Sequence, residues 1–206
     1  MGILDIQQFG VKLPLVGGSL TKEKLREVIP VFHQWIREQG RDVELLDVAD
    51  YSHVQDGPGV LLVGHEANFS VDGTEGEWGV LVQGKRDLPS DLDRRLHSIL
   101  MNGFRAVEDL EQALGEVEGD FRFSRKQLSF RVVNRLVTNG APSALAPLVD
   151  YLNRVLKGIF PGITFQMTQK LGDPRSVLTW VVVASSELDF RAFCPEVEGD
   201  KRVPLH

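Results

Sequence analysis

Residues 90–115 read SDLDRRLHSILMNGFRAVEDLEQALG, and this stretch holds the longest helical pattern of the chain. Apolar residues recur in it every three or four positions, which predicts a long amphipathic helix that buries one face. Ser90 and Asp93 form a partial capping box at its start, and Gly115 ends it. Gly103 predicts a close packing contact, because glycine inside a helix costs about 1 kcal/mol relative to alanine. The apolar stripe is Leu92, Leu96, Ile99, Leu100, Phe104, Val107, Leu110 and Leu114.

Strand signals precede this helix. Short apolar runs separated by turn residues such as Asp72-Gly73 predict three strands. Earlier still, the spacing of apolar residues predicts a helix that is capped by Thr21 and runs to about Glu38. Residues 1–20 are short apolar pieces broken by glycine and proline, which predicts an N-terminal arm or a short strand. The three runs are Val43–Val48, a run that begins at Val60–Val63 and continues toward Val71, and Trp78–Val82.

The chain after the long helix alternates strand and helix signals. Apolar and polar residues alternate within 119–137, which predicts a strand, and helical spacing predicts a helix over about 143–157. Two further strands are expected, at Ile163–Gln169 and Val177–Ala184. Residues from about 186 to 206 are mixed in character and are expected to form a C-terminal tail on the surface.

This order predicts an α+β fold. Helices and strands follow one another as α-β-β-β-α-β-α-β-β, which favours a mixed, mainly antiparallel sheet with about three helices packed on it. No strong linker divides the chain, so residues 1–206 are expected to form a single domain. Arg131 and Arg135 are spaced to share one face of a strand, and we expect them to pair with acids of the long helix.

Composition narrows the functional classes. The 206 residues carry a net charge of −6, which argues against an electrostatic grip on nucleic acid. No apolar run reaches the length of a membrane helix and no signal peptide is visible, so neither a membrane partner nor secretion is expected. The single cysteine, Cys194, excludes an intramolecular disulfide and favours a reducing compartment. We therefore expect a soluble, cytoplasmic protein.

Polar and catalytic residue types are densest in residues 47–68, which read DVADYSHVQDGPGVLLVGHEAN. His53 and His65 flank the turn Asp56-Gly57-Pro58-Gly59, and we expect this turn to bring the two histidines together. The part from Tyr51 to Asn68 is similar to a segment of uncharacterised bacterial proteins. That resemblance covers about twenty residues and implies no activity, cofactor or catalytic residue.

General acid and base chemistry is the first hypothesis for this segment. Either His53 or His65 would move a proton while a carboxylate, Asp56 or Glu66, orients the ring. Tyr51, together with the neighbouring Ser52, would contact the ligand.

Two other hypotheses use the same segment. His53, His65 and Glu66 are donor types that suit zinc or iron, with Asp47 or Asp50 as a fourth ligand, but their spacing matches no compact metal motif. Alternatively, the backbone of Gly57 and Gly59 would approach an anion such as the phosphate of a cofactor, although no phosphate-loop lysine accompanies them. The residues identify no particular cofactor.

The simplest interpretation is structural. Asp-Gly-Pro-Gly is then a tight turn, and both histidines are strand residues that bond to neighbouring groups. Because no motif of a known chemistry appears, we expect an interaction or regulatory module without catalytic activity, most simply a homodimer or a partner of another protein. The alternative is an enzyme or ligand-binding protein whose site is built on Tyr51, His53, Asp56, His65 and Glu66.

Overall fold

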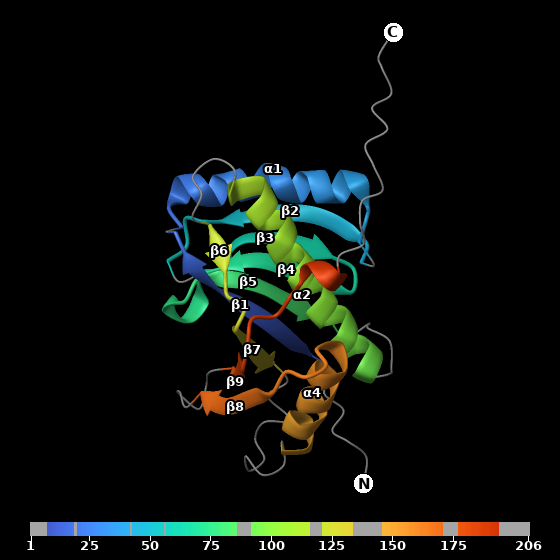
Figure 1. The fold of residues 1–206 in the computed structure, drawn as a ribbon. Coiled ribbons are helices and arrows are strands. Elements are labelled where there is room, and N and C mark those ends of the chain that lie inside the picture. The colour runs from blue at the N-terminus through green and yellow to red at the C-terminus, as the bar shows by residue number, and fades with distance from the viewer. Residues whose placement is uncertain are drawn as a thin grey trace.

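The computed structural model describes residues 8–18, 20–41, 43–55, 57–85, 92–115, 121–133, 146–170 and 177–193. The described part of the chain contains three α-helices and nine strands (Figure 1). The helices are α1 (Lys22–Glu38), α2 (Leu92–Gly115) and α4 (Ala146–Ile159). The strands are β1 (Phe9–Gly17), β2 (Leu45–Tyr51), β3 (Gly59–Gly64), β4 (Ala67–Asp72), β5 (Gly79–Gly84), β6 (Arg122–Phe123), β7 (Gln127–Val132), β8 (Phe165–Lys170) and β9 (Leu178–Ala184). Two short 3-10 turns are η1 (Thr74–Gly76) and η3 (Arg191–Phe193).

The strands form one sheet in the order β2-β3-β4-β5-β1-β7-β9-β8, with β6 paired to the end of β1. All the described pairs are antiparallel. The predicted fold class is therefore confirmed: the protein is α+β, with helices packed on a mainly antiparallel sheet. Within the described residues, no helix is both long and apolar enough to cross a bilayer.

Helix α2 crosses one face of the sheet diagonally (Figure 1). Its predicted apolar stripe is buried in the core except for Leu92, which is partly buried. Leu96, Ile99 and Phe104 are each at most 1% exposed, and α2 as a whole packs on β1 and β5. The contact expected at Gly103 is present, since a Cβ added there would lie 3.2 Å from the side chain of Leu13. Close approach of α2 to the central strand β1 thus explains the glycine.

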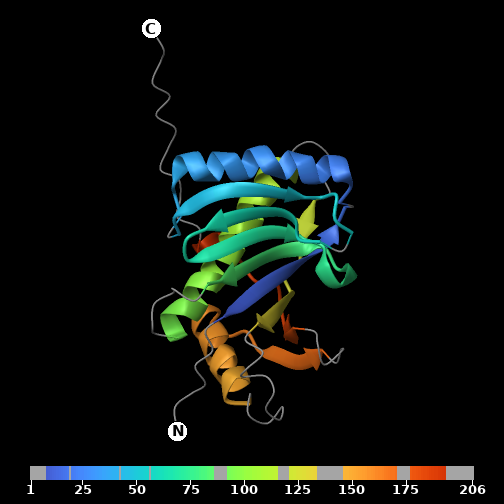
Figure 2. The same cartoon turned by 180° about the vertical axis from the view of Figure 1, so that it is seen from behind.

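Helix α1 lies along the β2 edge of the sheet (Figures 1 and 2). Its predicted start is confirmed, because the hydroxyl of Thr21 accepts a hydrogen bond from the amide of Lys24. Its apolar face reaches the sheet through Trp35, whose ring meets that of Phe69 on β4 edge to face, with 6.4 Å between centroids.

Of the two alternatives predicted for residues 1–20, the strand is correct and the arm is wrong for residues 9–17, because they form β1 in the middle of the sheet. Alternate side chains of β1, such as Val11 and Leu13, are fully buried against α2. Pro14 is tolerated because the amide of Leu15 bonds toward β5, so the missing N–H of Pro14 would point to the opposite side. On that side the pairing of β1 with β7 has already ended at Lys12.

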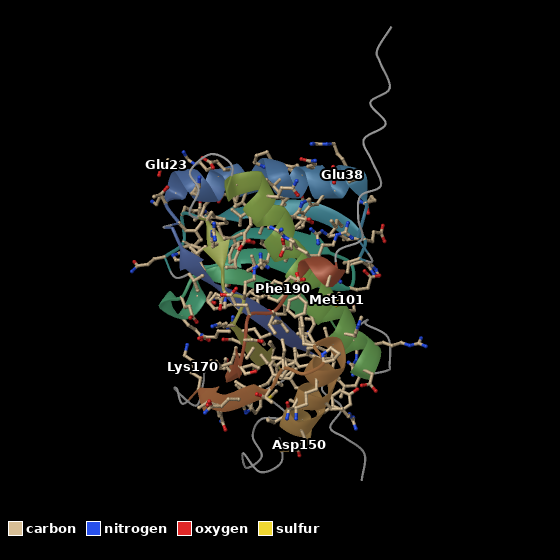
Figure 3. All side chains as sticks on the ribbon, in the orientation of Figure 1. Glu23, Glu38, Met101, Asp150, Lys170 and Phe190 are labelled. Atoms are coloured by element: carbon tan, nitrogen blue, oxygen red, sulfur yellow. The ribbon has the colours of Figure 1, made fainter. Side chains whose placement is uncertain are left out.

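The predicted surface tail also needs correction, because its first residues belong to the core. Leu188 and Phe190 are 4% and 1% exposed. The ring of Phe190, which Figure 3 labels, stacks on Phe104 of α2 with 4.3 Å between centroids and 10° between planes. Arg125 covers the same ring, its guanidinium carbon 4.6 Å from the centroid. Residues 194–206, with Cys194, lie outside the described residues.

The other face of the sheet carries no described helix, and Figure 2 views the molecule from that side, with α2 behind the strands. We call it the open face. Strand registers place alternate residues of each strand on it, among them Lys12, Asp72 and Arg131. Lys12 and Asp72 are nevertheless buried, at 4% and 2% exposure, so neighbouring groups of the open face must cover them.

Candidate functional site

The turn after β2 carries the first group of predicted site residues. Tyr51 ends β2 and is 39% exposed, and His53 is also exposed. The carboxylate of Asp50 accepts a 2.8 Å hydrogen bond from the amide of Ser52. Bonds from the hydroxyl and the amide of Ser52 lower the pKa of Asp50, and nearby His53 contributes less. Asp56 lies outside the described residues.

The turn between β3 and β4 carries the second group. Nδ1 of His65 lies 3.6 Å from Oε1 of Glu66, and the two side chains are 59% and 32% exposed. The other oxygen of Glu66 accepts a 3.3 Å bond from the amide of Glu44. A carboxylate therefore does lie beside a histidine, as the acid and base hypothesis requires, but both groups face solvent.

The expected convergence of His53 and His65 is wrong. The run predicted as one strand from residue 60 to 71 is two strands, with His65 in the turn between them and His53 in the turn that precedes β3. The histidines therefore lie at opposite ends of β3, whose six residues span about 17 Å at about 3.4 Å per residue. The simplest interpretation assumed that both histidines are strand residues, but neither of them is.

Because His53 and His65 lie far apart, the residues that the metal hypothesis assigns as ligands are divided between two turns. In the described parts of the chain, no three side chains of histidine, cysteine, aspartate or glutamate gather as metal ligands would. The catalytic roles assigned to Tyr51, His53, Asp56, His65 and Glu66 stay predictions, now for two separate turns.

The glycines of the first turn have structural reasons to be glycine. Gly59 has a φ of +62°, and an added Cβ would collide with the carbonyl oxygen of Val71 and lie 3.0 Å from the ring of Trp78. The amide of Gly57 already donates to the carbonyl of Val54 at 3.2 Å. The backbone of these glycines is thus in close contact with the protein itself, and their predicted role in binding a cofactor gains no support from the geometry.

The densest set of interacting charged groups lies elsewhere, on the open face. We call it the open-face ion cluster, and it joins β1, β4, η1, β7 and β8. At its centre, Nζ of Lys12 donates to Oδ1 of Asp72 at 2.6 Å and to the carbonyl of Thr74 at 3.1 Å. The hydroxyl of Thr74 donates to the same oxygen of Asp72 at 2.6 Å. Its members are Lys12, Asp72, Thr74, Glu75, Arg131 and Lys170.

The outer part of the cluster surrounds Glu75. Arg131 lies 3.2 Å from one carboxylate oxygen and Lys170 lies 3.1 Å from the other. The turn η1 thereby reaches over the open face to the end of β8, and Figure 3 labels Lys170 on the same side of the molecule as this turn. These bonds explain why Lys12 and Asp72 are covered although no described helix packs on this face.

This cluster was not predicted from the sequence, and the partners predicted for Arg131 are wrong. Arg131 was expected to pair with acids of the long helix, but its side chain lies on the face opposite α2 and pairs with Glu75. A signal was present: Lys12 stands between Val11 and Leu13 in a run that is otherwise apolar. Arg135 lies outside the described residues.

Acids of the long helix do have partners, and these fasten the helix to the rest of the fold. Asp109 bonds the guanidinium of Arg41, which lies over the ring of Trp35 at 3.7 Å from the centroid. Burial raises the pKa of Asp109, although the charge of Arg41 opposes the change. Glu111 bonds Arg125 at 2.5 Å. We assign these contacts to packing, because each fastens a loop or strand to α2.

Comparisons with known proteins leave the site to be argued from geometry alone. No model of a protein family matches the sequence, and no curated protein matches it either.

Proposed function

We propose that the protein is a non-enzymatic interaction module that works as a homodimer, and that two copies pair through the edge strand β8. The observation that carries the proposal is an unprotected sheet edge. The single cysteine of the sequence supports a reducing, cytoplasmic setting. Its net charge of −6 argues against nucleic acid as the partner.

Among the described residues, no strand pairs with the outer edge of β8, so the backbone groups on that edge have no strand partner. The carbonyl of Thr164 accepts a bond from the amide of Ser185, so the hydrogen-bonded pairs with β9 fall on even-numbered residues of β8. Odd-numbered residues then direct their N–H and C=O groups outward. Within the described chain, β8 pairs with β9 alone. The outward groups belong to Phe165, Met167 and Gln169.

The two edges of the sheet differ in their protection. β2 carries Asp47 and Asp50, has an irregular register after Leu45, and runs beside α1. Charges and bulges of this kind prevent a strand edge from pairing with another chain. By contrast, residues 165–169 of β8 contain neither a charge nor a proline, and their register with β9 is continuous. Strand addition is therefore favoured at β8.

Apolar side chains beside β8 would add buried area to such a pairing. α4 packs next to β8, and both elements carry apolar side chains that the single chain covers only in part. A second copy related by a two-fold axis would bring the same side chains together from both sides. They are Val155, Ile159, Phe165 and Met167.

The proposal is tested by the solution mass of the full chain and of Gln166→Lys/Thr168→Lys. Both side chains are exposed on the open face of β8, so lysine there leaves the fold intact but places like charges near their copies across the two-fold axis. We expect sedimentation equilibrium to give twice the chain mass for the wild type. In the variant, the dimer dissociation constant should rise at least about tenfold, equivalent to about 1.4 kcal/mol.

Gln34→Lys/Gln112→Lys is the matched control, because it adds the same charge at exposed positions of α1 and α2. This control should remain dimeric. The proposal would be ruled out if the wild-type protein stayed monomeric at 100 times the concentration used in a routine chromatography run. It would also be ruled out if Gln166→Lys/Thr168→Lys associated as well as the control.

A further inference from the structure

The carboxylate of Glu75 is held as a bound ligand would be. Its oxygen Oε1 lies 3.2 Å from Nη2 of Arg131 on β7, and Oε2 lies 3.1 Å from Nζ of Lys170 on β8. Each oxygen thus has its own cation, and the two cations come from strands separated in the sheet by β9. Charge-assisted bonds from an arginine and a lysine to the two oxygens of one group are typical of carboxylate recognition.

The backbone of Glu75 is in a conformation that its residue type disfavours. Its φ is +64°, in the left-handed region that glycine and asparagine adopt readily and glutamate does not. Gly76 follows with a φ of +73°. The ion pairs with Arg131 and Lys170 therefore hold the turn η1 against a local preference to change conformation. Outliers of this kind cluster at ligand clamps and switches.

The cations belong to strands of the sheet, so their backbone would stay in place if Glu75 moved away. Arg131 is only 11% exposed, and its guanidinium also lies 3.5 Å from the hydroxyl of Thr74. Lys170 is 45% exposed and can be reached from solvent. Without Glu75, the cluster would hold the three cations Lys12, Arg131 and Lys170 and the single acid Asp72, so its net charge would be positive.

We propose that Arg131 and Lys170 bind the carboxylate of a small organic acid, and that Glu75 occupies this place in the free protein as an internal substitute. A carboxylate fits better than a phosphate group, because Asp72 lies 3.8 Å from Nη1 of Arg131 and would repel additional anionic oxygens. Binding displaces Glu75 and releases the left-handed backbone of η1. The site shares β8 with the proposed dimer edge through Lys170, but it uses side chains of the open face, whereas strand pairing uses the outward backbone groups of Phe165, Met167 and Gln169.

The experiment uses Glu75→Gly in the full chain, titrated with sodium acetate at constant ionic strength maintained with chloride. Glycine suits the left-handed backbone, so the variant keeps the turn while it removes the internal carboxylate. Amide chemical shifts in two-dimensional NMR spectra give the dissociation constant. We expect acetate to bind the variant at least tenfold more tightly than the wild type. Glu75→Gly/Lys170→Met should lose this gain.

Glu187→Gly is the matched control, because it removes a carboxylate from another exposed loop, and it should bind acetate no better than the wild type. Should Glu75→Gly not fold, Glu75→Asn makes the same prediction, because asparagine also tolerates this backbone. Equal acetate affinity in the wild type and the Glu75 variants would overturn the proposal. So would a gain that survives Lys170→Met, or inorganic phosphate binding the variant more tightly than acetate.

Discussion

Asp72→Ala is expected to lower the free energy of unfolding by about 3–5 kcal/mol, because it leaves the ammonium of Lys12 buried without a carboxylate. The Lys12 and Asp72 side chains are 5% and 3% exposed, so solvent cannot replace the lost partner. Thr74 would lose two bonds to Asp72 as well, from its amide and its hydroxyl. Urea unfolding, followed by fluorescence and extrapolated to water, measures the change.

Lys12→Met should cost less than Asp72→Ala. In this variant Asp72 keeps the donors of Thr74 and lies 3.8 Å from Arg131, so its charge is not left alone. The double variant Lys12→Met/Asp72→Ala should cost less than the sum of the single changes, because no unpaired charge remains. Arg191→Ala is the control: Arg191 is 85% exposed and its pair with Glu108 should contribute less than about 1 kcal/mol. If the two single changes were additive and each as small as the effect of Arg191→Ala, Lys12 and Asp72 would not form a buried, coupled pair.

Gly59→Ala is the second change with a large expected effect, a loss of about 3 kcal/mol or more. Alanine is disfavoured at a φ of +62°, and its Cβ would collide with the carbonyl of Val71. Val71 is a fully buried residue of β4, so its backbone cannot move aside without disturbing the pairing of β3 with β4. The midpoint of urea unfolding should fall accordingly.

Substitutions at two other glycines distinguish the effect of the positive φ from the effect of the contact with Val71. Gly76 has a φ of +73° but open space around its Cβ position, so Gly76→Ala should cost only about 1 kcal/mol. Gly115 has neither a positive φ nor a neighbour within 4 Å, and Gly115→Ala should change stability by less than about 1 kcal/mol. A Gly59→Ala variant as stable as Gly76→Ala would show that the Val71 contact does not matter.

Helices were predictable where local pattern and packing agree. The apolar stripe of α2 repeats over six turns and is buried from Leu96 to Leu114, so the pattern alone identified the element and its face. α1 was predictable for the same reason, with Thr21 as a cap that local sequence specifies. These features depend on residues three or four positions apart, which a sequence displays directly.

Strands with irregular local signals were harder to predict. Gly10, Pro14 and Gly17 suggested breaks in β1, yet Gly10 fits a close approach to the carbonyl of Val82, and Pro14 stands where no partner needs its N–H. The turn at His65-Glu66 contains neither glycine nor proline and was therefore read as part of a strand. In both cases the deciding contact comes from a neighbouring strand.

The open-face ion cluster depends on contacts between distant residues. Lys12 and Asp72 are 60 positions apart, and Glu75 and Lys170 are 95 positions apart. A sequence gives the residue types but not the register that places Lys12 on β1 near the end of β4. Local density had instead drawn attention to residues 51–66, whose two histidines the β3 strand keeps apart. A concentration of polar and catalytic residue types in one stretch of sequence thus did not predict which residues lie close together in the fold.

Hydrogen exchange of the β8 amides, measured by NMR over a range of protein concentrations, tests the proposed dimer most directly. The amides of Phe165, Met167 and Gln169 point outward and should become protected as the concentration rises. Those of Gln166 and Thr168 bond to β9 and should be protected at every concentration. If the three outward amides exchange at the same fast rate at all concentrations, β8 does not pair with a second copy.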